Sequence, residues 1–396
     1  MSSSAHELEE RLAEIEDPLI GADIVSLGLV NEVEIDDETA HVSLAFNTPF
    51  APSEVEIGNR IREVVVEAGL EPDLRAQAGG RHGFDEEIMP EVRNVIAVAS
   101  GKGGVGKTTV AANIAAGFAD LGARVGVLDA DIHGPNVPTI LPVDEEPGTT
   151  PDEDKLVPPV YEGVKVMSMG FLVRNRDDPA IMRGPMVNRV MTHFMENVEW
   201  GQLDYLIVDL PPGTGDASLD LLQQLPVAGT VIVTTPQEMA VNDARKGLRL
   251  FETHDTPVLG VVENMSAYRC PNCGDEHDPF GRGGAAEIAE QYDVTMLPTL
   301  PIHADFGADG SEAPVVLDED SPVREPTIDL VEQVIDRISE VNRRTVAEHV
   351  GVLPETDEAD EGEEADDESD EGGTDEAAEG GTDEAAESGE EASPPE

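Results

Sequence analysis

The segment 101–109 combines four glycines, two lysines and two threonines in nine residues, GKGGVGKTT. It fits the spacing G-x-x-x-x-G-K-[S/T] and lies between an apolar strand-like run and a helical run. In that setting backbone N–H groups converge on phosphate oxygens, and the helix N-terminus adds positive potential. We therefore expect ATP or GTP here, with Lys107 at the terminal phosphates and Thr108 on Mg²⁺. The predicted nucleotide-binding residues are Gly101, Lys102, Gly103, Gly104, Val105, Gly106, Lys107, Thr108 and Thr109.

Three aspartates follow strand-like runs and suit the chemistry of a bound nucleotide. Asp129 and Asp131 follow the run 125–128, and Asp209 follows the run 205–208. An aspartate at the carboxyl end of a buried strand beside a phosphate loop suits Mg²⁺ coordination through water. We assign that role to Asp209, and we assign the positioning of the attacking water to Asp131. Asp129 is expected to order the switch region or Mg²⁺-bound water. The alternative is that all three only form turns at strand ends.

Cys270 and Cys273 are the two cysteines of the chain and are three residues apart. In a reducing compartment this spacing favours metal or redox chemistry over a structural disulfide. Structural zinc and iron–sulfur clusters usually take four ligands, so a second pair has to come from elsewhere. Three interpretations stay open from the residues alone: an iron–sulfur cluster, a zinc site to which His277 adds a ligand, and a redox or inert pair.

The elements that must position these residues follow an alternating pattern. A strand over 95–99 leads into the loop, and a helix over 108–119 follows it. Further strand-like runs alternate with helical ones, and a last helix is expected over 323–349. This alternation predicts an α/β fold of the P-loop NTPase type, with a mostly parallel sheet covered by helices. The further strand-like runs are 125–128, 205–208, 230–234 and 258–262.

The chain divides by composition into four parts. We expect a small α/β domain over 1–80, a glycine-rich linker over 81–93, the P-loop domain over 94–350 and a disordered acidic tail over 351–396. The tail has almost no large apolar residues, so burial cannot offset the entropy of ordering it. Within the first part the pattern predicts helices over 6–15 and 54–68, and strands over 24–35, 41–46 and 74–77.

Acidic residues dominate the composition, with 84 Asp and Glu against 24 Lys and Arg, a net charge of −60. Residues 355–396 hold 21 of these acids and no base, so residues 1–354 still carry −39. At about 1 M salt the Debye length is about 3 Å and such repulsion is screened, which indicates a halophilic protein in a salt-rich cytoplasm. The alternative is an ordinary acidic protein. This charge disfavours nucleic acid and anionic membranes as partners, and the first residues lack the pattern of a secretory signal.

Six runs of the sequence resemble the Mrp/ApbC family, which belongs to the deviant Walker A group of P-loop ATPases. Lys102, the lysine that this loop carries in addition to Lys107, is characteristic of that group. The runs extend over roughly residues 92–345: SGKGGVGKTT at 100–109, DADIHGPN at 129–136, MRGPMV at 182–187, DLPPGTGD at 209–216, ENMS at 263–266 and CPNCG at 270–274. The run DPLIGADIVSLGLV at 17–30 is similar to the MIP18-type (DUF59) domain.

This resemblance implies an ATP-hydrolysing carrier that holds a [4Fe–4S] cluster between the Cys270 and Cys273 pairs of two subunits and transfers it to apoproteins. It also implies an ATP-sandwich homodimer in which Lys102 reaches the nucleotide of the partner subunit, and it places Asn264 at the adenine edge. Two alternatives are a partitioning-type positioning ATPase and a zinc-bridged regulatory ATP-binding protein. Residues 47–52 lack the cysteine that MIP18-type domains often carry, which argues against a metal role there. Residues 302–305, IHAD, depart from the LDP-like family pattern.

Overall fold

The computed structural model describes residues 5–76, 89–131, 134–143, 145–151, 154–172, 184–213, 215–270, 272–307 and 314–352. The predicted acidic tail from residue 353 onward and residues 81–88 of the predicted linker lie outside these ranges. Within the described part, no helix is both long enough and apolar enough to cross a membrane.

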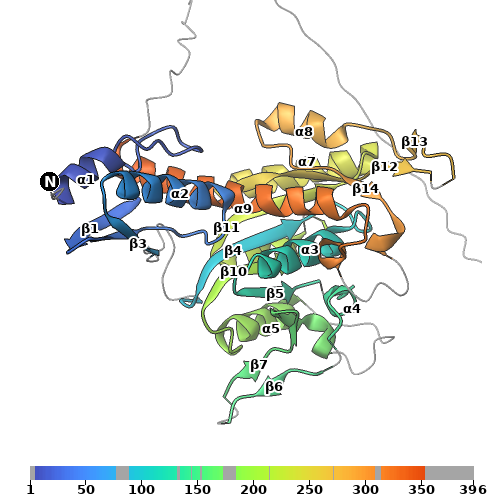
Figure 1. Cartoon of the computed structure of the whole chain (residues 1–396). Coiled ribbons are helices and arrows are strands. Elements are labelled where there is room, and N and C mark those ends of the chain that lie inside the picture. The colour runs from blue at the N-terminus through green and yellow to red at the C-terminus, as the bar shows by residue number, and fades with distance from the viewer. Residues whose placement is uncertain are drawn as a thin grey trace, which may run out of the picture. The chain divides into compact units, whose positions relative to one another are not determined.

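A large sheet runs through the P-loop half of the chain (Figure 1) and has nine strands in the part that the structure describes. Its order is β13-β12-β11-β4-β10-β5-β9-β8, and β14 pairs with β12. All pairings are parallel except those of the short edge strands β8 and β13, which confirms the predicted mostly parallel sheet. The strands are β4 Val92–Ala99, β5 Val125–Asp129, β8 Val160–Tyr161, β9 Val164–Ser168, β10 Leu203–Asp209, β11 Val227–Thr234, β12 Val258–Arg269, β13 Glu276–His277 and β14 Leu300–Ile302.

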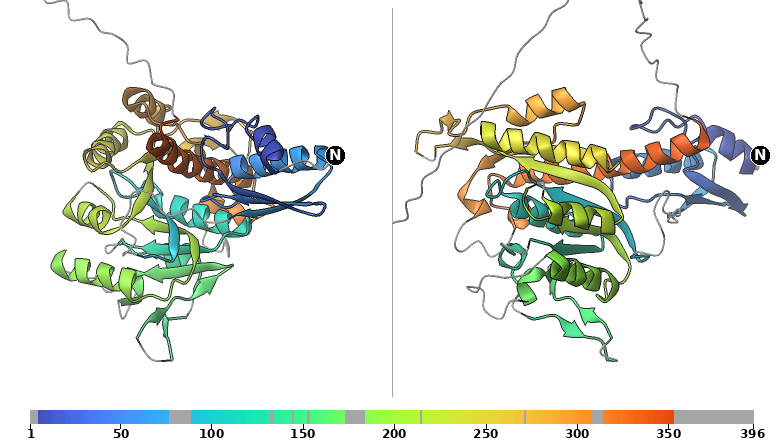
Figure 2. Two further views of the ribbon diagram at one scale, coloured as in Figure 1. Left: turned by 90° about the vertical axis from the view of Figure 1, so that its left-hand side faces the viewer. Right: turned by 180° about the vertical axis from the view of Figure 1, so that it is seen from behind.

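Helices cover both faces of this sheet. The side chains of a strand point alternately to opposite sides, so a strand of apolar residues gives the sheet two apolar faces. In β4, Ile96 and Val98 pack into one apolar cluster, and Val95 and Ala97 pack into another. The first cluster is covered by α3 Lys107–Asp120, α4 Val137–Ile140 and α9 Arg324–Val350. The second is covered by α5 Gly184–Glu196, α6 Asp216–Gln224, α7 Glu238–Thr253 and α8 Gly284–Tyr292. Figure 2 shows the strands lying between these two groups of helices.

Short elements complete this part of the chain. Strands β6 and β7 form an antiparallel pair. In the ranges that the structure describes, turns of 3₁₀ helix follow β9, follow β14 and precede α9. Their bounds are β6 Gly148–Thr149, β7 Leu156–Val157, η1 Met169–Leu172, η2 Ala304–Phe306 and η3 Val315–Leu317.

The N-terminal part of the chain, up to Ala76, forms a separate three-stranded sheet with its own apolar core. Its elements are α1 Ala5–Leu12, β1 Val30–Asp36, β2 Thr39–Leu44, α2 Pro52–Glu67 and β3 Glu71–Ala76. The predicted strand over 24–35 is wrong in its first half. Asp23 Oδ1 accepts the N–H groups of Val25 (3.1 Å) and Ser26 (2.8 Å), and Gly28 has a φ of 67°. An aspartate bonded to the following backbone makes a turn. The strand therefore begins only at Val30.

Helix α9 belongs to both cores. Its side chains pack with α3 over the large sheet, and Ala347 belongs to the core of the small sheet. Arg343 forms a buried ion pair with Asp17 at 2.6 Å, with side chains 5% and 0% exposed. A buried pair of this kind is costly to break from one side, because the remaining charge is left without a partner.

Candidate nucleotide and cysteine site

The phosphate loop joins β4 to α3, in the order that the sequence predicts. Gly104 and Gly106 have φ values of 82° and 86°. This region of backbone conformation favours glycine. Gly101 is required for another reason, since a Cβ there would lie 2.1 Å from the backbone carbon of Asp243 in α7. Helix α3 begins at Lys107, directly after Gly106. The loop therefore packs closely on α7 while its backbone turns into the N-terminus of a helix, which attracts anions.

Lys107, Thr108 and Asp209 meet at the start of α3. The ammonium of Lys107 contacts Asp209 Oδ1, and the hydroxyl of Thr108 donates to Asp209 Oδ2 at 2.7 Å. Lys107 is 5% exposed and Asp209 is fully buried. A hydroxyl and a carboxylate beside a phosphate loop are oxygen ligands of the kind that Mg²⁺ takes. The donor set thus fits the ion that the sequence assigns to Thr108 and Asp209.

Of the other two predicted aspartates, Asp129 lies beside Asp209 because the sheet register places Asp129 of β5 directly opposite Asp209 of β10. Asp129 accepts the Ser168 hydroxyl (2.9 Å) and the N–H groups of Asp131 (3.2 Å) and Val137 (3.1 Å). Burial, and next the negative charge of Asp209, raise the pKa of Asp129 to about 7. Asp129 therefore fixes the segment that carries Asp131.

Asp131 itself is 7% exposed, and its Oδ1 accepts the N–H of Gly134 at 3.1 Å. Burial is the main cause that raises the pKa of Asp209, and the charge of Asp131 adds to the rise while Lys107 opposes it. The loop after Asp209 also returns to the phosphate loop, since the N–H of Gly213 donates to the Ser100 carbonyl at 2.8 Å. The structure therefore brings together Lys107, Thr108 and the three predicted aspartates.

Lys102 differs from the other lysines of the chain in its surroundings. Lys107, Lys155 and Lys246 form ion pairs, and Lys165 donates to the carbonyl of Trp200. Lys102 is half-buried and forms no ion pair within the described residues. Its ammonium is therefore available for a charge that the described part of the chain does not supply.

Asn264 contacts the phosphate loop directly. Its side-chain amide donates to the carbonyl of Val105 at 2.8 Å, and its Oδ1 accepts the N–H of Met265 at 2.9 Å. A Cβ on Gly106 would lie 2.1 Å from Asn264 Nδ2. The family resemblance placed Asn264 at the adenine edge and did not predict this contact, which joins residues 159 positions apart.

Glu263 is a site residue that the sequence analysis missed. It is 3% exposed, and its two carboxylate oxygens accept the N–H groups of Gly283 (3.2 Å) and Ala285 (2.9 Å). A carboxylate at a helix N-terminus is favourable, and here it holds the start of α8 against β12. The only signal in the sequence is an acid directly after an apolar strand-like run.

Cys270 and Cys273 lie in the loop of a β-hairpin. Strand β13 pairs with the end of β12 (Figure 1), and the register places Tyr268 opposite His277. Cys270 is half-buried, Cys273 is exposed and both are free thiols. The backbone N–H of Cys273, and next that of Asn272, lower the pKa of Cys270. The thiolate is the form that binds metals, so the loop favours the ligand form of Cys270.

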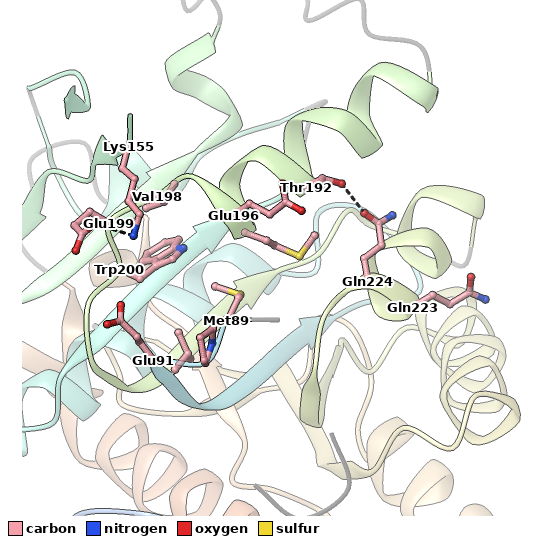
Figure 3. A pocket seen from close by; sticks show the side chains of 13 residues that line it. Met89, Glu91, Lys155, Thr192, Glu196, Val198, Glu199, Trp200, Gln223 and Gln224 are labelled. Carbon is pink, nitrogen blue, oxygen red and sulfur yellow. Dashed lines mark hydrogen bonds and ion pairs between the residues drawn. The ribbon is translucent and has the colours of Figure 1, made fainter. Parts of the chain in front are cut away.

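A cavity of about 660 Å³ lies away from these residues (Figure 3). Val92, at the amino end of β4, is part of its lining, whereas the phosphate loop follows the carboxyl end of that strand. A strand of this length spans about 26 Å, so the cavity is remote from the phosphates. Its wall holds the ion pair Lys155–Glu199 (3.1 Å) and the hydrogen bond from Thr192 to Gln224 (3.2 Å).

Comparison with known proteins gives one family match over the large sheet and another over the small N-terminal sheet. The family model of the NUBPL iron-transfer P-loop NTPase matches residues 91–337, and that of the iron–sulfur cluster assembly protein matches residues 6–72. The iron-sulfur cluster carrier protein of Synechocystis sp. is 39% identical over 326 residues, which are 78% of this chain and 90% of the relative. That of Deinococcus radiodurans is 37% identical over 345 residues, which are 87% and 97% of the two chains.

A solved structure adds a nucleotide to this comparison. The nucleotide-binding protein of Archaeoglobus fulgidus in complex with ADP is 37% identical, with a TM-score of 0.52, and covers 61% of this chain and 93% of its own. The matched family model spans more than half of the chain and includes the phosphate loop, the aspartates and the cysteine hairpin. The chain therefore belongs to the family of NUBPL-type iron-transfer P-loop NTPases.

Proposed function

We propose that this chain carries an iron–sulfur cluster on Cys270 and Cys273 and delivers it to apoproteins under the control of ATP binding and hydrolysis. The observation that carries the proposal is the cysteine hairpin. Its thiols are accessible, the pKa of Cys270 is lowered by backbone N–H groups, and the hairpin extends from the strand that contacts the phosphate loop. The names of the relatives as cluster carrier proteins point to the same cargo.

The nucleotide half of the proposal is hydrolysis of ATP to ADP and phosphate. Lys107 binds the terminal phosphates once they displace it from Asp209, and Lys102 contacts the nucleotide of a partner subunit. Asp131 positions the attacking water, and Asn264 lies at the adenine. Thr108 and Asp209 hold Mg²⁺, which neutralises charge on the phosphate oxygens when it is bound. The ADP in the relative from Archaeoglobus fulgidus supports a nucleotide at this loop.

The cluster half of the proposal requires two chains. The chain has two cysteines. A [4Fe–4S] cluster held by protein thiolates takes four. A homodimer with its two hairpins facing each other across the two-fold axis supplies them. The ammonium of Lys102, which forms no ion pair with a residue of the described ranges, fits the same dimer, because a nucleotide held by the partner subunit offers it phosphate charge.

Anaerobic reconstitution with iron and sulfide tests the carrier proposal. We expect about four iron and four sulfide per dimer, with cluster absorption that disappears in Cys270→Ala and in Cys273→Ala while ATP binding persists. Lys107→Ala is the matched control, which should keep the cluster and lose hydrolysis. Transfer is measured as activation of an apoprotein by the loaded dimer. A colourless dimer with about one zinc, unchanged after reconstitution, would remove the carrier proposal.

We further propose that the chain works in a salt-rich cytoplasm. The support is its charge, since residues 1–354 carry −39 without the acidic tail. Screening at molar salt reduces the repulsion that such a surface creates.

A further inference from the structure

The segment that carries both cysteines is tied to β12 at its beginning and at its end. It follows Asn264 as the last part of β12, which still pairs with β14 at Tyr268, and it ends at Gly283, whose N–H donates to Glu263. Neighbouring residues of a strand point to opposite faces. Glu263 accordingly anchors the end of the segment, while Asn264 contacts the phosphate loop. Residues 265–282 therefore begin next to Asn264 and end at the contact with Glu263.

The backbone is strained where this segment begins. Met265 has a φ of 58°. Residues other than glycine rarely adopt this conformation. The pairing of β12 with β14 shifts its register between Asn264 and Tyr268, and the hydroxyl of Ser266 donates to the carbonyl of Leu300 at 3.1 Å. The N–H of Met265 is held by the Oδ1 of Asn264. A strained residue persists only where its surroundings hold it, so the conformation of Met265 depends on the position of the Asn264 side chain.

The nitrogen of the Asn264 side-chain amide contacts the phosphate loop. Its Nδ2 donates to the carbonyl of Val105 and lies so close to Gly106 that a Cβ there would collide with it. Val105 and Gly106 lie directly before Lys107, so phosphate that enters the loop acts on the backbone to which Asn264 is bonded. One side chain thus spans the loop backbone and the strained start of the cysteine segment.

We propose that Asn264 is a positioning residue that couples nucleotide occupancy of the phosphate loop to the conformation of the cysteine hairpin. The inference rests on the proposed function, because it assigns the step by which nucleotide regulates the thiols that would hold the cluster. The coupling works in both directions. If nucleotide changes the state of the hairpin by a given factor, a ligand on the thiols changes nucleotide affinity by the same factor.

The test uses the full-length, metal-free chain and two measurements with and without saturating MgADP. One is the rate at which iodoacetamide alkylates Cys270 and Cys273 at fixed pH. The other is hydrogen–deuterium exchange of peptides over residues 266–277. In the wild type we expect MgADP to change the alkylation rate about 5-fold or more, which is the usual lower range of coupling between sites. In Asn264→Asp, which keeps the size and the Oδ1 atom but loses the donor to Val105, the ratio should fall to about one.

Ser266→Ala is the matched control, because it removes a hydrogen bond from the same strand without touching the phosphate loop. It should keep the wild-type ratio. Asn264→Ala is a second variant, and it adds no charge. Saturating MgADP keeps the nucleotide site filled even if a variant has lost an adenine contact, so a changed ratio then reports loss of coupling. A wild type whose thiols do not respond to MgADP, or Asn264 variants that respond like the wild type, would overturn the proposal. Failure of cluster reconstitution would instead contradict the carrier function. The alkylation rates with and without MgADP can still be compared in that case, because they are measured on the metal-free protein.

Discussion

Lys107 and Lys102 lie in the same loop but have different surroundings, and their substitutions should therefore differ. In the proposed mechanism, Lys107→Ala removes the main cation at the terminal phosphates, so ATP turnover should fall by at least about 100-fold. It also leaves the buried carboxylate of Asp209 without its ion partner. This loss should cost about 3–5 kcal/mol in the nucleotide-free protein. Lys102→Ala should leave the monomer's stability unchanged, spare part of the ATP binding and impair hydrolysis and dimer closure.

Urea unfolding measures the loss of stability, and phosphate release measures the loss of ATP turnover. The double variant Lys107→Ala, Asp209→Asn should regain much of the lost stability, because it removes the stranded charge, yet it should remain inactive. Wild-type turnover in Lys107→Ala would contradict the assignment of the loop.

The carboxyl of Asp129 should make stability depend on pH near neutrality. Its pKa is raised from 3.8 to about 7 in the folded chain, chiefly by burial. Between these two values the folded state binds more protons than the unfolded chain, so the free energy of unfolding falls as pH rises, by at most about 1.4 kcal/mol per pH unit. Asp129→Asn should flatten this part of the profile. Urea unfolding from about pH 4.5 to about pH 8, without Mg²⁺ and at constant molar salt, measures it, and parallel profiles for the two proteins would contradict the prediction.

At the scale of elements, one carboxylate holds the start of α8 to β12. Glu263→Ala leaves the N–H groups of Gly283 and Ala285 without their acceptor. The loss should cost about 1.5–3 kcal/mol. Glu263→Gln keeps a single acceptor and should cost less. Hydrogen exchange should rise first at the start of α8 and spread into the cysteine hairpin. If exchange rises uniformly over the whole chain, Glu263 contributes only global stability.

The strand, loop and helix around Lys107 could be predicted from the sequence, because each feature of that unit is local. The glycine spacing, the apolar run and the helical run all lie within the segment 95–119. The start of β1 was misplaced because Asp23 bonds to its neighbours and turns an apolar run that otherwise suits a strand. The contact from Asn264 to Val105 could not be predicted, since it depends on how strands distant in sequence are ordered in the sheet.

For the molecule as a whole, salt should decide stability, because residues 1–354 carry a charge of −39. The Debye length is about 3 Å at about 1 M salt and about 10 Å at about 0.1 M salt. Dilution over this range therefore restores the repulsion between surface acids, and the melting temperature should fall. Deleting residues 355–396 should change it little at high salt. Calorimetry over a salt series measures both, and equal stability at low salt would show that the acidic surface is not a salt adaptation.

The buried pair of Asp17 and Arg343 also has a consequence for how the chain is made, because its two members lie far apart in the sequence. At the usual pace of synthesis, a ribosome produces the aspartate tens of seconds before the arginine. During that interval the small sheet is already outside the ribosome, while the helix that supplies Arg343 and Ala347 has not been synthesised. The part of the protein that is translated first is therefore among the last to reach its final packing. Until then, the place on the small sheet that Arg343 and Ala347 cover stays open, whereas the rest of its core is supplied by its own residues.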